Sequence, residues 1–116
     1  MSLQSFRLHG VNIEQAKVDI TDKQTKTLVA ALANHKGKIY RLVVTGKQEC
    51  HFVIRTASQE LRDVFIGSDL TPHIEEAQDF RWPVLAGNVN SDLQIYQSDL
   101  TSCDASVYIQ YRYESV

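Results

Sequence analysis

The chain has few of the residues that mark a covalent scaffold or a membrane segment. Its 116 residues include two cysteines, two prolines and one tryptophan. Two cysteines exclude a disulfide framework, and Cys50 and Cys103 do not form a Cys-x-x-Cys pair. We expect both to be buried free thiols, with a Cys50–Cys103 bridge as the alternative. The longest apolar run, residues 28–33, is far too short to span a bilayer.

No charge of one sign dominates the sequence. Twelve Lys and Arg residues against fourteen Asp and Glu residues give a net charge of −2, and the two signs are interleaved. The sequence therefore offers no basic patch for nucleic acid or for an anionic membrane. The N-terminus carries Gln4, Arg7 and His9 where a signal peptide would have its apolar core, so we expect the protein to be made in a cytoplasm.

What the sequence does have is alternation of apolar and polar side chains. The last twelve residues show it best, with the period of two that is typical of a strand with one buried face. The apolar set there is Val107, Ile109, Tyr111 and Tyr113, and the opposite set is Tyr108, Gln110 and Arg112. Similar patterns predict strands or extended segments at residues 16–21, 27–32, 38–45, 50–55, 61–66, 72–77 and 93–97, with a turn beginning at 80–84.

Residues 22–37 also admit a helix, because Thr21 and Gln24 have the spacing of a capping box. We favour a strand there, since the polar residues 22–27 place no apolar stripe at helical spacing. The sequence thus predicts an all-β, single-domain antiparallel β-sandwich of about eight strands, jelly-roll-like, over residues 14–116. Residues 1–13 are expected to form an extended N-terminal arm.

No catalytic or metal-binding motif stands out. The sequence contains no nucleophile elbow, no phosphate-binding glycine loop and no metal-ligand spacing, so we expect no catalytic residue, no metal and no cofactor. The histidines are isolated in sequence, and we interpret His51 and His73 as hydrogen-bonded surface residues and not as metal ligands.

Two surfaces are candidates for binding another protein. The arm holds apolar residues without a clean period, which must cover a sheet edge of their own subunit or dock on a neighbour. The polar face of the last strand carries an amphipathic aromatic residue, which favours a subunit interface. The interface candidates are Phe6, Leu8, Val11 and Ile13 in the arm and Tyr108, Gln110 and Arg112 in the last strand.

Several segments, read in order, resemble small phage virion β-sandwich proteins. The resemblance is carried by Ala16-Lys-Val-Asp-Ile, a polar turn, Thr27-Leu-Val-Ala-Ala and then Gly37-Lys-Ile-Tyr-Arg-Leu-Val-Val. It continues through Trp82-Pro, Ala86-Gly-Asn and Leu93-Gln-Ile to the closing Ile109-Gln-Tyr-Arg-Tyr-Glu. It therefore covers residues 16–114. Residues 69–80 are more acidic and poorer in glycine than is usual in that group, and residues 98–104 carry a cysteine.

The resemblance implies a jelly-roll-like, non-enzymatic structural protein of the virion. The role it implies is a capsid decoration or cement subunit that stabilises the phage head through protein–protein contacts. Its partners would be the major capsid protein or another virion protein, and it would form a trimer or dimer. The alternative is a carbohydrate-binding or receptor-binding β-sandwich of a tail or fibre. Its candidate glycan contacts are Trp82, Asp69, Asp79 and Asp99.

Overall fold

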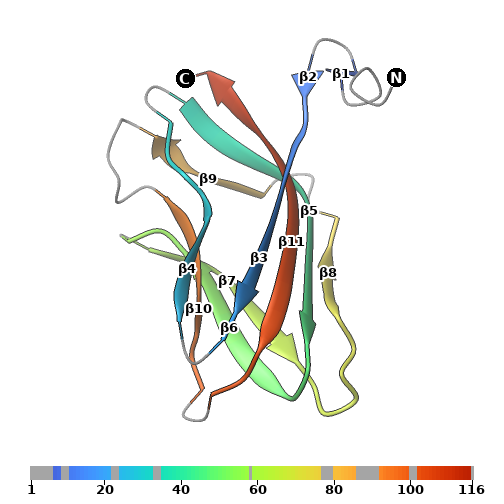
Figure 1. Ribbon diagram of the computed structural model, residues 1–116. Helices are drawn as coiled ribbons and strands as arrows, with labels where there is room; N and C mark the ends of the chain where they lie inside the picture. The colour runs from blue at the N-terminus through green and yellow to red at the C-terminus, as the bar shows by residue number, and fades with distance from the viewer. Residues whose placement is uncertain are drawn as a thin grey trace.

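The chain forms eleven β-strands in the part that the computed structural model describes, namely residues 7–8, 11–21, 24–32, 35–57, 59–76, 80–85, 92–99 and 102–115 (Figure 1). In chain order they are β1 (Arg7–Leu8), β2 (Val11–Asn12), β3 (Glu14–Ile20), β4 (Thr25–Val29), β5 (His35–Gly46), β6 (Cys50–Arg55), β7 (Glu60–Ile66), β8 (His73–Glu75), β9 (Phe80–Leu85), β10 (Leu93–Gln97) and β11 (Ala105–Ser115). Across these ranges no helix is long and apolar enough to cross a membrane.

The strands pair as one long hairpin that has been folded and rolled up. At its tip β6 pairs with β7, and moving outward β5 pairs with β8 and β9, β4 with β10, and β3 with β11, all antiparallel. Because β8 and β9 pair with successive parts of β5, they share one strand position beside it. Rolling the hairpin adds the pairs β11–β5 and β10–β6.

The result is two facing sheets, one of order β3-β11-β5-β8 with β9 also on β5, the other of order β4-β10-β6-β7 (Figure 1). Nested pairing of eight strands in two sheets is the jelly-roll arrangement. The expected antiparallel, jelly-roll-like sandwich of about eight strands is therefore confirmed.

The core lies between the sheets and is built from alternate residues of each strand. Its members are mostly β-branched residues and leucine, which suit a pleated, half-buried surface. Removing their side chains from water stabilises the fold by about 25 cal/mol per Å² of apolar area. The largest side chains that are fully buried are Phe52, Ile20, Ile39, Leu42, Ile54, Ile66, Leu93, Ile95 and Ile109.

Strand β11 lies between β3 and β5, and a β-bulge in β5 shifts the register of the β11–β5 ladder. The ladder with β5 shifts between Gln110 and Tyr111, which pair with Arg41 and Ile39 and leave Tyr40 as the extra residue. A bulge of this kind reverses which alternate residues face inward. In β5 the buried positions are accordingly Ile39 on one side of the bulge and Leu42 on the other.

Polar contacts lie at both lateral openings of the sandwich. On one side the short connection from β3 to β4 is held by a hydrogen bond from the Gln24 N–H to the Thr21 carbonyl, at 3.1 Å. On the other side Arg62 in β7 donates to Glu75 in β8 at 3.1 Å, and Glu75 is hydrogen-bonded to His73 at 2.8 Å. This polar bridge links the edge strands of the two sheets.

Three local expectations can be compared with the structure. The helix considered for residues 22–37 is not formed: the described part of this segment holds strand β4 and the start of β5. The turn predicted at residues 80–84 is wrong, because β9 pairs there with β5. Pro83 suggested the turn, but β9 is an edge strand, where the missing N–H of proline costs no ladder bond. Within the segment expected as an extended arm, β1 and β2 pair with each other.

The alternation in β11 leads to a matched pair of substitutions. Ile109 is fully buried, so Ile109→Ala should lower the free energy of unfolding by about 2–5 kcal/mol. Its neighbour Gln110 faces the other way, and Gln110→Ala should cost less than about 1 kcal/mol. Urea unfolding followed by fluorescence measures both. Equal costs for the two variants would contradict the assignment of inward and outward faces.

Candidate functional sites

The outer face of the five-stranded sheet carries a row of apolar side chains across three strands. Tyr108 in β11 lies opposite Val43 in β5, and Val43 lies opposite Ile74 in β8. Cross-strand partners share a face, and Val43 stands between the inward residues Leu42 and Val44, so the row lies on the outer face, where Val43 and Tyr108 are half-buried. Ile74 is 52% exposed. Lys17 in β3 continues the row beyond Tyr108.

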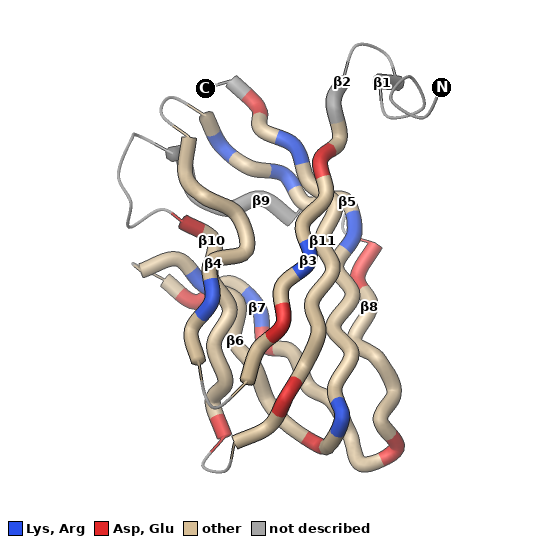
Figure 2. Tube along the Cα trace, in the orientation of Figure 1, with Lys and Arg blue, Asp and Glu red and all other residues tan. Residues whose placement is uncertain are grey.

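Polar and charged residues surround this row on the same face. Gln110, one of the predicted interface residues, lies between Gln15 and Arg41, and Arg41 forms an ion pair with Glu76. Figure 2 shows positions of both charge signs on the strands of this sheet. An apolar centre with a polar margin is the composition of a protein–protein contact surface.

Arg112, the third predicted residue of this face, contacts its own sheet. Its guanidinium donates to Glu114 at 2.8 Å and lies 5.7 Å from the centre of the Tyr40 ring. The ammonium group of Lys38 lies 5.1 Å from the same ring. The bulge in β5 therefore places Tyr40 between two cations, which hold it against the sheet by cation–π attraction. Tyr111 and Tyr113 on the inner face pack against the core, as predicted.

The structure places the predicted arm residues as follows. Leu8 and Val11 are backbone partners in the β1–β2 ladder, and Ile13 is partly buried immediately before β3. Phe6 lies outside the described residues. The β1–β2 pair is a separate two-stranded sheet, so the sandwich itself begins at β3.

The three predicted glycan contacts that the structure describes, Asp69, Trp82 and Asp99, are not brought together. Trp82 lies in β9 opposite Gly37, near the start of β5, whereas Asp99 follows β10 and contacts the first residues of β6, beyond the end of β5. Gly46 lies nine positions after Gly37 in β5, which corresponds to roughly 30 Å along a strand. Asp69 binds Thr71 in the turn after β7, and Asp79 lies outside the described residues.

On the outer face of the four-stranded sheet, His51 is held by several partners. Its Nδ1 lies 3.0 Å from the Ser98 hydroxyl and its Nε2 lies 2.9 Å from the Asp63 carboxylate. The His51 ring also stacks on Phe65, with centroids 4.2 Å apart and planes at 5°. As predicted, both His51 and His73 are hydrogen-bonded and lie near the surface.

Serine, histidine and aspartate are the residue types of a hydrolytic triad, and Ser98, His51 and Asp63 are hydrogen-bonded in that order here. A triad needs a carboxylate protected from water and N–H donors aimed at the developing oxyanion. The Asp63 side chain is 62% exposed, and its attraction to His51 is screened by solvent. We interpret the chain as fixing the His51 ring against Phe65, which is itself 62% exposed.

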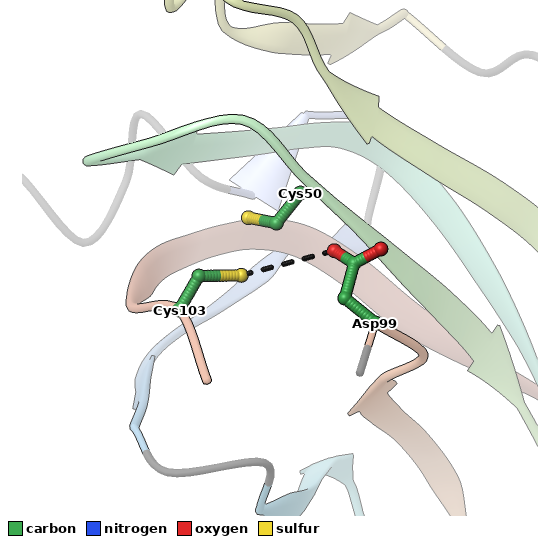
Figure 3. A group of neighbouring side chains, drawn as sticks. All are labelled: Cys50, Asp99 and Cys103. Atoms are coloured by element: carbon green, nitrogen blue, oxygen red, sulfur yellow. Dashed lines mark hydrogen bonds between the residues drawn. The ribbon is translucent and has the colours of Figure 1, made fainter. Parts of the chain in front are cut away.

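A second group of side chains meets at the lower end of the sandwich, where Cys50 begins β6 and residues 98–104 connect β10 to β11 (Figure 3). The sulfur atoms of Cys50 and Cys103 and a carboxylate oxygen of Asp99 all lie within 4.8 Å of one another. Both cysteines are buried and unbridged, which confirms the expectation of free thiols. Burial raises the pKa of both thiols above the ordinary value of 9.0, and the charges of Asp99 and Asp104 raise it further.

Backbone hydrogen bonds hold this group in place. The carboxylate of Asp99 accepts from the N–H of His51 at 2.5 Å, and the N–H of Cys103 donates to the side chain of the buried Gln97 at 3.1 Å. The group opens onto a cleft of about 620 Å³, whose lining includes Cys50, Asp99, His51 and Phe65.

Reasoning from sequence missed both the histidine chain and the thiol–carboxylate group. The alternation in Cys50–Arg55 already put Cys50 and His51 on opposite faces. However, Ser98, Asp99 and Cys103 are about fifty residues away along the chain, and only the pairing of β10 with β6 brings them to Cys50 and His51. No pattern within either segment predicts that β10 pairs with β6.

No protein-family model and no curated protein matches the sequence. Several solved structures are similar in fold, among them the cyanophage Pam1 capsid asymmetric unit (TM-score 0.49, 12% identity, 88% of this chain and 84% of that one). The major capsid protein of bacteriophage PM2 gives a TM-score of 0.46 at 8% identity, over 90% of this chain and 45% of that one. The coat protein of Tobacco streak virus gives 0.34 at 14% identity, over 87% of each chain. At these values the function of the chain has to be inferred from its own residues.

The environment of the thiols predicts low chemical reactivity. In the reduced, folded chain both cysteines should react with a disulfide reagent at about pH 8 at least about tenfold more slowly than in urea, because a raised pKa and burial leave little accessible thiolate. The rate of thiol modification is followed by absorbance, and Cys50→Ser leaves Cys103 as a single reporter. Rapid modification of either thiol in the folded chain would contradict the burial of Cys50 and Cys103.

Proposed function

We propose that this protein is a non-enzymatic structural subunit of a phage virion, a capsid decoration or cement protein that works through protein–protein contacts. The observation that carries the proposal is the solvent-facing row Tyr108–Val43–Ile74, with its polar margin, on the five-stranded sheet of a jelly roll. Jelly rolls are common among viral capsid proteins, although they also occur in lectins and cupins, so the surface has to support the assignment.

We assign the contact to a sheet face and not to a sheet edge. At one edge of the sandwich the charged side chains of Arg62 and Glu75 pair between β7 and β8, and charged residues at an edge disfavour the addition of a strand from a partner. The outer face, in contrast, presents an apolar row that crosses the central strand β5. Exposed apolar groups that are rimmed by polar residues mark interaction sites.

A second copy of the chain is the partner that we assign to this face. Tyrosine and arginine are enriched in interfaces, and a face that carries both Arg41 and Glu76 offers charges of both signs to an identical face rotated by a two-fold axis. A stable contact buries about 1,600 Å² in total, which is within reach of one sheet face. The arm, residues 1–13, would then remain available to bind the shell or a neighbouring subunit.

If two copies associate through this face, a single charge introduced into its apolar row should weaken the oligomer. Ile74→Lys should weaken the oligomer at least about tenfold, because it replaces an apolar contact by a charge that must be desolvated. Light scattering over a range of concentrations measures the mass. Phe65→Lys is the matched control, since it places the same charge at an exposed apolar position on the opposite sheet. A chain that is monomeric throughout, or one dissociated by Phe65→Lys alone, would refute the assignment of this face.

The separate pairing of β1 with β2 predicts that the arm is dispensable for folding. Deleting residues 1–13 removes no strand of the sandwich, so the free energy of unfolding should change by less than about 1 kcal/mol. The truncated chain should lose binding to purified capsid shells in co-sedimentation. Loss of cooperative unfolding would show that the arm belongs to the core, and unchanged shell binding would remove its assigned role.

A further inference from the structure

We propose that Cys50, Cys103 and Asp99 form a binding site for a thiophilic divalent cation of the Zn²⁺ type. The proposal is independent of the virion role. It starts from the convergence of two sulfur atoms and one carboxylate oxygen within 4.8 Å of one another; Figure 3 shows the sulfur of Cys103 facing the carboxylate of Asp99, with the side chain of Cys50 beside them.

The spacing fits the coordination geometry. In a tetrahedral zinc site with Zn–S near 2.3 Å and Zn–O near 2.1 Å, neighbouring ligand atoms are about 3.5–3.8 Å apart. The carboxylate oxygen of Asp99 lies 4.0 Å from the sulfur of Cys103. Bringing all three ligand atoms to bonding distance therefore needs side-chain adjustments of about 1 Å or less, without refolding of the strands.

The surrounding backbone orients the ligands before any ion arrives. Asp99 is oriented by the N–H of His51, and Cys103 by the buried side chain of Gln97. Cys50 is fixed by its place in the ladder, where it pairs with Ile66. Outer partners of this kind are what metal sites use to fix their ligands.

The donor set selects the class of ion. Two thiolates and one carboxylate favour Zn²⁺ over Mg²⁺ or Ca²⁺, which prefer oxygen ligands. In the described residues of the connections at this end (47–49, 67–72, 98–99 and 102–104) the acidic residues Glu49, Asp69, Asp99 and Asp104 outnumber the basic residue Lys47, so the local field attracts cations. A water molecule would take the fourth position, and the cleft next to Cys50 and Asp99 gives the ion a way in.

Binding exchanges protons for the metal. The two S–H bonds break, their protons go to solvent, two Zn–S bonds form, and the ion gives up waters of hydration to the three protein ligands. No oxidant or reductant is needed. The bound ion would cross-link Cys50 at the start of β6 to Asp99 and Cys103 in the connection between β10 and β11.

The experiment uses the full-length chain, reduced and freed of metal. Zn²⁺ is titrated against a chromogenic chelator, and we expect one ion per chain with release of about two protons. Co²⁺ should give the sulfur-to-metal charge-transfer absorption of a thiolate site. The thermal midpoint should rise with Zn²⁺ concentration, because the ion binds only the folded chain at this site.

Substitutions separate this site from adventitious binding. Cys103→Ser should reduce the affinity for Zn²⁺ at least about a hundredfold, and Asp99→Asn, which keeps an acceptor for the His51 N–H, at least about tenfold. Asp69→Asn is the matched control: it removes another carboxylate from the same end that is not a ligand, so the affinity should fall by less than about twofold, as expected for a screened surface charge. Asp99→Asn also covers the case in which the cysteine variant fails to fold.

Three results would overturn the proposal. The first is the absence of stoichiometric Zn²⁺ binding. The second is binding that Asp99→Asn and Asp69→Asn weaken equally, which would indicate a diffuse acidic surface. The third is a reduced chain that converts in air to a Cys50–Cys103 disulfide even with Zn²⁺ present, seen as loss of the two thiol hydrogens by mass spectrometry.

Discussion

The double ladder of β11 is the constraint on which the remaining structure depends. This strand pairs with β3 on one side and with β5 on the other, so it joins the last segment of the chain to the first and third strands of the sandwich. Because side chains in a strand alternate, a slip of one residue would turn Val107 and Ile109 out of the core. The burial of these two residues therefore fixes the register of three strands at once.

The same register decides what the outer surface presents. Once Leu42 and Val44 face inward, Val43 must face outward between Tyr108 and Ile74. The bulge at Tyr40 lets β5 keep Ile39 in the core as well. The solvent-facing apolar row is thus a consequence of packing the core.

The end of the sandwich at which Cys50 begins β6 is built from polar connections and not from alternating strand residues. There the strands stop, and the connections bring together polar and sulfur-containing side chains from segments far apart in the chain. Cys50 and His51 are neighbours in sequence but face opposite ways, one toward Cys103 and Asp99 and the other toward Ser98 and Asp63. A single strand thereby supplies the buried thiol of one group and the surface imidazole of another.

The sequence by itself determined the class of fold, since period-two alternation in segments such as Cys50–Arg55 requires a strand with one buried face. It also determined that Tyr111 and Tyr113 pack on the core. The prediction of a turn at residues 80–84 was wrong. Pro83 by itself indicates a turn, whereas in the fold this segment pairs with β5 as the edge strand β9. The tertiary structure alone decided that Trp82 lies far from Asp99, and that Cys50, Cys103 and Asp99 meet. Periodicity reports the local environment of each strand, whereas partners about fifty residues apart are chosen by the order in which the strands pair.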